Sequence, residues 1–374
     1  MVVDGLITDE NSSYTVKLSR TIQEQNAMPG KLSDATVYIT DEIENSTYLT
    51  GMGDGIYRTD SIGFKGIVGK TYILHIVTHE GNEYESEPCL MQSVPEIDSL
   101  YFTKDQELVN NGTETLNGIR IFLDSKKGDN NKYYRWDFEE TWKFKVPTPK
   151  KSDYIDEDTF VPVDMVNEYC WKKRKSDEVT IHSAYSEQAE RIEKQPVFFI
   201  ATDKSDRLLM QYSILVRQYS ISKKEYDFWD NLKRVNESGN DIFAIQPFPV
   251  ISNIHNLDNP NEQVLGYFQV SAVKQKRKNI LLNDIVGLNL PFYHYPCERI
   301  ELALSDVPWP KFAPPLTWDG LYSMYCITSD YYFVEPKYIQ GTNELEKMVF
   351  ARPECADCAV TGSLVKPDFW IDEN

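Results

Sequence analysis

Six cysteines are the residues of this chain whose type and spacing could do chemistry. Two of them, Cys89 and Cys170, stand apart, and four crowd the last quarter of the 374-residue sequence. Those four are Cys297, Cys326, Cys355 and Cys358. Clustered thiols bind zinc, exchange disulfides in redox enzymes, or form structural disulfides. An even number of cysteines permits complete pairing, which is typical of proteins that fold in an oxidising compartment.

The last two cysteines, Cys355 and Cys358, have the CxxC spacing of zinc sites and redox enzymes. A zinc site needs about four ligands, and the sequence has no second CxxC pair and no histidine near the first. A redox CxxC begins a helix after a strand, whereas this one follows Arg352-Pro353-Glu354 and precedes a loop that contains glycine. We therefore predict structural disulfides drawn from Cys297, Cys326, Cys355 and Cys358, with the pairing left open.

Other catalytic and metal-binding motifs are missing from the sequence. The five histidines include no HExxH motif, and there is no nucleophile elbow, phosphate loop or dinucleotide-binding glycine motif. His75 and His79 would lie too far apart along a strand to share one metal. The acidic run at residues 153–158 lacks the ligand spacing and central glycine of an EF-hand. We predict that the protein is not an enzyme and has no catalytic residue, no bound metal and no cofactor.

The formal net charge of −19 excludes several classes of partner. It repels nucleic-acid backbones and anionic lipid surfaces, so no nucleic-acid partner is predicted. Two basic runs, residues 172–175 and 274–278, depart from this charge. Because charged residues protect the edges of sheets, we predict solvated loops or strand edges there rather than a phosphate site. No apolar run is long enough to predict a membrane-spanning helix.

The first predicted domain covers residues 1–95, in which short apolar runs alternate with turn signals. These runs are predicted as strands at residues 14–18, 35–39, 46–50 and 72–77. Regular strands separated by turns are typical of an antiparallel β-sandwich of the immunoglobulin or prealbumin type. Prolines at Pro88 and Pro95 then indicate a linker, since they cannot extend a central strand.

A second β-rich domain is predicted over residues 96–284, again as an antiparallel sandwich. Its segment 147–185 is polar and weakly periodic, so we predict a long insertion that leaves the sheet. One helix is predicted at 222–236, because Ser222 and Glu225 fit a capping box and Trp229 lies on its apolar face. We expect that helix to pack across the open side of the sheet.

The remaining segment, residues 285–374, is rich in proline and tyrosine and has little periodicity. We predict an irregular, disulfide-stapled C-terminal segment packed on the second domain. It closes with Lys366-Pro367-Asp368-Phe369-Trp370, in which Lys366, Phe369 and Trp370 are predicted to be structural. The fold class is therefore mainly β, with tandem sandwiches and one packed helix.

Several blocks of the sequence, taken together, resemble a known family. The blocks are residues 2–8, 66–72, 84–86, 216–222, 226–229, 265–268, 355–358 and 366–370. Their order and spacing resemble the Bacteroidota lipoproteins known as domain of unknown function 4249, and the resemblance covers essentially the whole chain. The family contributes no catalytic residues.

The resemblance implies a location and a partner. Members carry an N-terminal lipoprotein signal that ends in a lipidated cysteine, and they are expected at the outer membrane, on the cell surface, with a periplasm-facing position also compatible. Their genes often accompany TonB-dependent receptors, which implies an outer-membrane β-barrel partner. This sequence lacks the signal and the lipidated cysteine and opens within a predicted strand. We therefore expect that a targeting segment precedes it in the full protein.

Three functions are compatible with these observations. The first is a non-catalytic surface lipoprotein that acts as an accessory or ligand-capture subunit of an outer-membrane transport or assembly complex. The alternative is a surface adhesin or glycan-binding module, which the 23 tyrosines and seven tryptophans favour. A hydrolase whose carboxylates converge only in the fold is the third.

Overall fold

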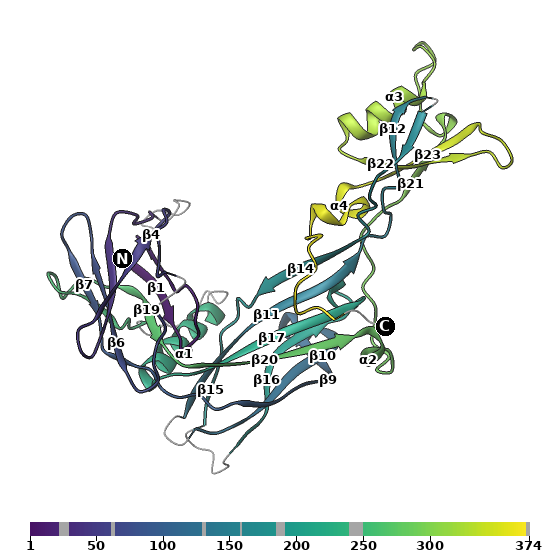
Figure 1. Ribbon diagram of the computed structural model, residues 1–374. Coiled ribbons are helices and arrows are strands. Elements are labelled where there is room, and N and C mark those ends of the chain that lie inside the picture. The colour runs from purple at the N-terminus through teal and green to yellow at the C-terminus, as the bar shows by residue number, and fades with distance from the viewer. Residues whose placement is uncertain are drawn as a thin grey trace.

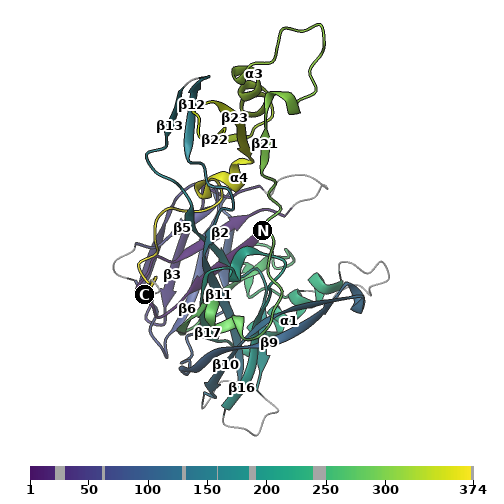
Figure 2. The same cartoon turned by 90° about the vertical axis from the view of Figure 1, so that its right-hand side faces the viewer.

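The computed structural model describes residues 1–21, 30–60, 64–128, 132–157, 159–184, 191–238 and 250–371. Strands dominate this part of the chain, so the mainly β prediction is confirmed. The strands form three units, which we call the N-terminal unit, the central sandwich and the distal head. Figure 1 shows the N-terminal unit and the distal head at opposite ends of the molecule, and Figure 2 shows the same head from the side.

The N-terminal unit is built from one continuous path of strands. Its first strands are β1 (Val2–Ile7), β2 (Thr15–Ser19), β3 (Thr36–Asp41), β4 (Ser46–Gly51), β5 (Ile56–Arg58), β6 (Thr71–Val77), β7 (Glu83–Ser86) and β8 (Cys89–Leu90). Alternate residues of β6 are buried, as the period of a strand with one solvated face requires. Two strands from much later in the chain, β18 (Ile254–Asn256) and β19 (Leu265–Val270), complete the path.

These late strands change the predicted domain boundary. The order in the sheet is β18-β7-β6-β3-β4-β5-β2-β1-β19, and β19 lies parallel to β1. A domain that ends at residue 95 would lack both outer strands, and an antiparallel sandwich would lack this parallel pair. Residues 254–270 therefore belong to the N-terminal unit rather than to the second domain.

One buried side chain brings the two ends of this path together. Asn253 precedes β18 and is 2% exposed. Its Oδ1 accepts a hydrogen bond from the backbone N–H of Phe268, and its Nδ2 donates to the carbonyl oxygen of Phe268, both at 2.9 Å. The Asn253 side chain thus bonds both the N–H and the carbonyl oxygen of Phe268, in the way that the backbone of a neighbouring strand does.

The central sandwich consists of two facing sheets. One sheet contains β9 (Ile97–Val109), β10 (Glu114–Lys126) and β16 (Arg191–Ala201). The other contains β11 (Tyr133–Lys145), β14 (Tyr169–Lys175), β15 (Thr180–Ser183), β17 (Gln211–Ser220) and β20 (Val273–Leu281). Their inner faces share one core, which includes Ile119, Ile121, Trp136, Phe138, Ile200, Tyr212 and Ile214. The predicted insertion at 147–185 is thus partly wrong, because β14 and β15 within it pair with β11.

The distal head has a sheet and a core of its own. Its sheet contains β21 (Ile300–Leu302), β22 (Tyr332–Tyr338) and β23 (Leu345–Ala351), and the hairpin β12 (Ser152–Asp156) and β13 (Thr159–Pro162) packs against it. Helix α3 (Trp318–Tyr322) and the π-helix η4 (Ser323–Thr328) cover one side. We predicted an irregular segment packed on the second domain, and that prediction is wrong for the head, which Figure 1 shows projecting away from the central sandwich. It holds for the two ends of the segment, since Ile285, Leu290 and Cys358 lie in the core of the central sandwich.

The remaining helices are short, apart from one. They are α1 (Lys223–Ser238), α2 (Leu282–Val286), α4 (Pro353–Ala356), η1 (Asn110–Gly112), η2 (Asp206–Leu208), η3 (Leu304–Asp306) and η5 (Cys358–Val360). The structure places α1 within two residues of the predicted 222–236. It lies between the N-terminal unit and the central sandwich rather than across the open side of a sheet (Figure 1). Within the described residues, no helix is long and apolar enough to cross a bilayer.

Candidate functional site

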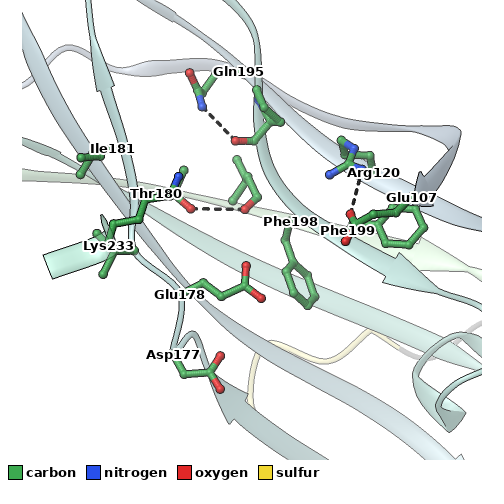
Figure 3. Close-up of a pocket in the computed structure, with 13 residues that line it drawn as sticks. Glu107, Arg120, Asp177, Glu178, Thr180, Ile181, Gln195, Phe198, Phe199 and Lys233 are labelled. Carbon is green, nitrogen blue, oxygen red and sulfur yellow. Dashed lines mark hydrogen bonds and ion pairs between the residues drawn. The ribbon is translucent and has the colours of Figure 1, made fainter. Parts of the chain in front are cut away.

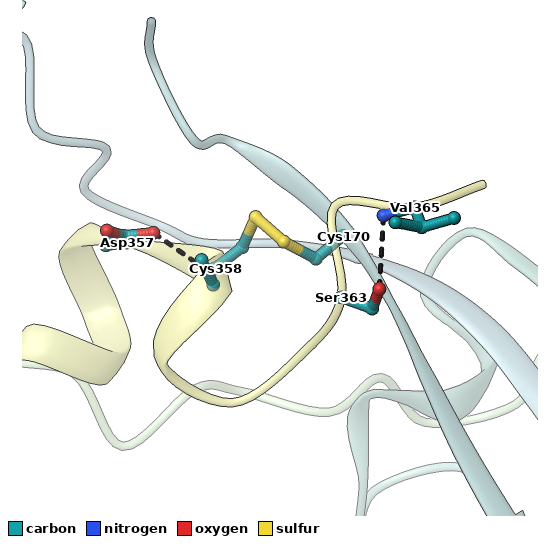
Figure 4. Close-up of a disulfide and its surroundings, with 6 residues drawn as sticks. Cys170, Asp357, Cys358, Ser363 and Val365 are labelled. Atoms are coloured by element: carbon teal, nitrogen blue, oxygen red, sulfur yellow. Dashed lines mark hydrogen bonds between the residues drawn. A yellow bond between two sulfur atoms is a disulfide. The ribbon is translucent and has the colours of Figure 1, made fainter.

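We call residues 358–371 the tail, and the segments that connect the central sandwich to the head, residues 146–151, 163–168, 291–299 and 352–357, the neck. Two disulfides join the tail and the neck to the rest of the chain. Cys170 on β14 bonds Cys358, and Cys297 bonds Cys355. Figure 4 shows the first of these bonds between the tail and the central sandwich. Cys326 is a free thiol in η4, so its assignment to a disulfide is wrong. The tail runs back to β14, so the partner of Cys358 lies 188 residues upstream rather than in the same cluster.

Beyond Cys358 the tail pairs with β14 at one residue pair. The backbone N–H groups of Trp171 and Ser363 each donate to the other residue's carbonyl oxygen at 2.9 Å. Gly362 sits so close to the core that a Cβ there would lie 2.6 Å from the ring of Phe144. The tail therefore follows the sandwich at a distance that only glycine permits at this point.

The closing block is anchored on the outer face of the same sheet. Trp370 is 5% exposed and packs edge-on against Trp171, with ring centroids 6.2 Å apart. The guanidinium of Arg277 lies 3.5 Å from the ring centroid of Phe369, within cation–π range. Lys366 is exposed and lines the groove between β14 and the tail. Phe369 and Trp370, which were predicted as structural together with Lys366, therefore pack on the outer face of the central sandwich.

Both basic runs lie on edge strands, as predicted. Residues 172–175 belong to β14 and residues 274–278 to β20, the two outermost strands of their sheet. Lys276 donates to the carbonyl oxygens of Ile97 and Asp98, which joins the two sheets along this edge. Lys172, Arg174 and Lys274 form ion pairs with Asp206, Glu140 and Glu96.

A groove of about 610 Å³ opens beside β15 and β16 of the central sandwich (Figure 3). Its lining comes from β9, β10, the β14–β15 connection, β15, β16 and α1: Glu107, Arg120, Asp177, Glu178, Val179, Thr180, Ile181, Gln195, Pro196, Val197, Phe198, Phe199 and Lys233. Arg120 forms ion pairs with Asp105 at 2.5 Å and with Glu107 at 2.9 Å, and it covers Phe199. The groove therefore combines charged side chains held in place by ion pairs with apolar lining residues, and such a mixture of polar and apolar groups is found at ligand sites.

The backbone of the groove resists the addition of another strand. Its wall β16 is an edge strand, which would ordinarily recruit an extended peptide. Pro196 lacks the N–H that such a peptide needs, and the register shifts beside it, between Ile121 and Phe122 on β10. A ligand here would be held by side chains rather than by strand pairing. Among the described residues, no group of three His, Cys, Asp or Glu side chains is arranged to hold a metal ion.

Comparison with known proteins identifies the family. The model of a family described as Domain of unknown function (DUF4249) matches residues 1–277. This chain belongs to the DUF4249 family. The match spans the N-terminal unit and most of the central sandwich, and it ends before β21, β22 and β23 of the head. No curated protein matches the chain.

This DUF4249 chain buries an acidic side chain where its first two units meet. Ser222 Oγ accepts a hydrogen bond from the backbone N–H of Glu225 at 3.1 Å, which is the serine half of the predicted capping box. The Glu225 carboxyl turns inward, is 3% exposed and accepts a hydrogen bond from Trp229 Nε1 at 3.4 Å. Burial raises the pKa of Glu225 to about 7, although Arg135 opposes the shift.

The sequence contained a signal for this burial. Glu225 lies three and four residues before Phe228 and Trp229, so it shares their apolar face of the helix. From the N-terminal unit, Tyr267 approaches the same helix, with its ring centroid 4.9 Å from that of Phe228. A residue predicted to cap the helix is therefore also part of the contact between two units.

We expect Glu225→Gln to make stability less dependent on pH. The Glu225 carboxyl has a pKa of about 7 in the folded state and an ordinary pKa of about 4.5 in the unfolded chain. Its ionisation therefore favours the unfolded state, and the free energy of unfolding falls as the pH rises from about 4.5 through 7. The wild type should lose up to about 3 kcal/mol of unfolding free energy relative to the glutamine variant over that window. Urea denaturation at pH 5 and pH 8 measures the difference. The exposed Glu346→Gln is the control, and equal pH dependence of wild type and Glu225→Gln would contradict the expectation.

The far end of the head presents an apolar loop that the sequence marked only as irregular. We call residues 308–315 the head loop. Phe312 at its tip is fully exposed, and Trp309 is 41% exposed. The alternation of prolines with Trp309 and Phe312 was the available signal, because prolines hold aromatic side chains out of a regular sheet.

Proposed function

We propose that this protein is a non-catalytic, lipid-anchored surface lipoprotein of the Bacteroidota. It serves as an accessory or ligand-capture subunit of an outer-membrane transport or assembly complex of the TonB-dependent receptor type. The observation that carries this proposal is the distal head, which the chain holds away from its body on a neck crossed by disulfides. The resemblance of the sequence supplies the location and the class of partner.

Two disulfides and two backbone hydrogen bonds stabilise the neck. Cys297–Cys355 lies at the neck, and Cys170–Cys358 ties its base to β14. Backbone hydrogen bonds from Thr148 to the carbonyl oxygen of Cys355 (3.1 Å) and from Lys150 to that of Ala356 (2.9 Å) join the incoming and outgoing segments. A rigid arm loses little conformational entropy when its end binds a partner, so this construction favours a docking role.

The groove of the central sandwich supports the ligand-capture part of the proposal. It lies in a different unit from the head, so a ligand could occupy it while the head engages a partner. The glycan-binding alternative would use the same groove. Its aromatic side chains are unfavourable for that purpose, because Phe198 is buried and Arg120 covers Phe199. We expect no binding on a glycan array, and a specific signal there would favour the alternative.

Co-purification tests the main proposal. The full-length lipidated protein, carrying an affinity tag, is isolated from detergent-solubilised outer membranes, and its partners are identified by mass spectrometry. We expect a β-barrel receptor of the TonB-dependent type in near-stoichiometric amount. A second tagged lipoprotein from the same membranes is the control. Recovery of the protein alone would contradict the proposal.

A further inference from the structure

We propose that the head loop docks this protein onto its outer-membrane partner by inserting Phe312 into an apolar pocket with a carboxylate at its rim. The inference rests on the proposed function, and it names the contact surface and the chemistry that the partner must offer.

The exposure of the loop is the first argument. Phe312 is fully exposed and Trp309 is 41% exposed, while Pro308, Pro310, Pro314 and Pro315 are exposed beside them. Folded proteins rarely leave an aromatic tip uncovered without a use for it, and tryptophan is among the residues that dominate binding energy at interfaces. Both exposed aromatic side chains lie within one short segment, and Phe312 has the highest exposed fraction of the large apolar side chains that the structure describes.

The second argument is that the loop is already shaped for binding. Trp309 Nε1 donates to the carbonyl oxygen of Pro314 at 2.6 Å, and the N–H of Ala313 donates to that of Pro310 at 3.0 Å. These two bonds close the loop across its base and across its tip. Four of its eight residues are prolines, which fix the backbone φ angle. Such a loop loses little entropy on binding, as a docking element requires.

The base of the loop is continuous with the core of the head. Val307 and Trp318, on either side of it, pack against the cluster around Leu321, Phe333 and Phe350. The backbone N–H of Ala303 is held by the carboxylate of Asp306 at 2.9 Å, which caps η3 at the start of the loop. The loop that carries Phe312 is therefore fixed to the packed core of the head, and the disulfides of the neck join that core to the central sandwich.

The charge of the loop indicates which kind of molecule binds it. Lys311 is its one charged residue, on a chain of net charge −19. A second copy of the chain would bring two strongly acidic bodies together, and an anionic lipid surface would be repelled by the same charge. One phenylalanine and one tryptophan also offer a small area for insertion into lipid. An apolar protein pocket with a carboxylate placed for Lys311 satisfies both the apolar tip and its cation.

Site-specific photo-crosslinking tests this contact in the full-length protein in its own membrane. A photo-reactive amino acid at position 312 is expected to crosslink to the β-barrel receptor, with the product identified by mass spectrometry. The matched control is position 43, because Ile43 is exposed between β3 and β4 of the N-terminal unit. That unit lies at the other end of the molecule from the head (Figure 1), and no crosslink is expected. Crosslinking from position 312 to a lipid or to a second copy of the chain would overturn the inference.

A variant separates this inference from the proposed function. Phe312→Ser should reduce the co-purified receptor at least tenfold, whereas Ile43→Ser should leave it unchanged. Both side chains are exposed, so an unchanged melting temperature confirms that each variant is folded. If the wild type recovers the receptor and Phe312→Ser recovers as much, the inference is wrong and the proposed function stands. If the wild type recovers no receptor, both fail.

Discussion

Removing the Cys170–Cys358 disulfide by replacing both residues with alanine is expected to lower the free energy of unfolding by about 4 kcal/mol. The bond closes a loop whose ends are 188 residues apart, so its loss restores a large amount of conformational freedom to the unfolded chain. It also frees the tail from β14, which weakens the contact between Trp370 and Trp171. Denaturation under non-reducing conditions, followed by tryptophan fluorescence, measures the change.

Two control variants accompany this experiment. The Cys297–Cys355 pair closes a shorter loop, with a separation of 58 residues, and its removal should cost about 1 kcal/mol less on chain entropy alone. Cys326 is a free thiol, so Cys326→Ala should change stability least of the three. A result in which Cys326→Ala is the most damaging variant would show that the assigned pairing is wrong.

Gly266→Ala is expected to be the most damaging single substitution in the N-terminal unit, at about 4 kcal/mol or more. Gly266 lies in β19 opposite Val3 of β1, and its φ angle is +90°. A Cβ at this position would lie 1.8 Å from the carbonyl oxygen of Val3, which is impossible without separating the two strands. Thermal and urea denaturation of the purified variant measure the loss.

The appropriate control is a glycine with the same backbone but free space around it. Gly81 has a φ angle of +89° and nothing within 4 Å of where a Cβ would lie. Gly81→Ala should therefore show the backbone strain alone, about 1–3 kcal/mol. The difference between the two variants isolates the contact with Val3. Equal losses would mean that the close approach of β1 and β19 does not exist.

The buried carboxyl of Glu225 and the apolar Phe312 are two departures from the ordinary placement of such residues. A carboxyl with a pKa of about 7 weakens the contact between two units as the pH rises, and an exposed aromatic side chain forgoes burial. Sites that lower stability in this way are often functional. Of the two, only Phe312 lies where another molecule can reach it.

Local patterns in the sequence predicted the elements whose cause is local. The apolar run at residues 72–77 predicted β6, which the structure has as Thr71–Val77. The spacing of Ser222, Glu225 and Trp229 predicted a helix at 222–236, where the structure has Lys223–Ser238. The sheet of the distal head was missed, since Pro336 interrupts the strand pattern of β22. The closing Phe369-Trp370 was predicted to be structural, and in the structure the two rings pack on Arg277 and Trp171.

The sequence by itself determined the mainly β class, the one long helix, the use of cysteines as disulfides and membership of the family. Only the tertiary structure decided which segments meet. Val3 pairs with Gly266, Cys170 with Cys358, and Tyr154 packs on Tyr322 in the head. Such contacts join residues far apart in the chain, and their free energy depends on the fit of two surfaces and on loop closure rather than on either local pattern. The exposure of Phe312 also depends on such contacts, because they set the position of the head relative to the rest of the molecule.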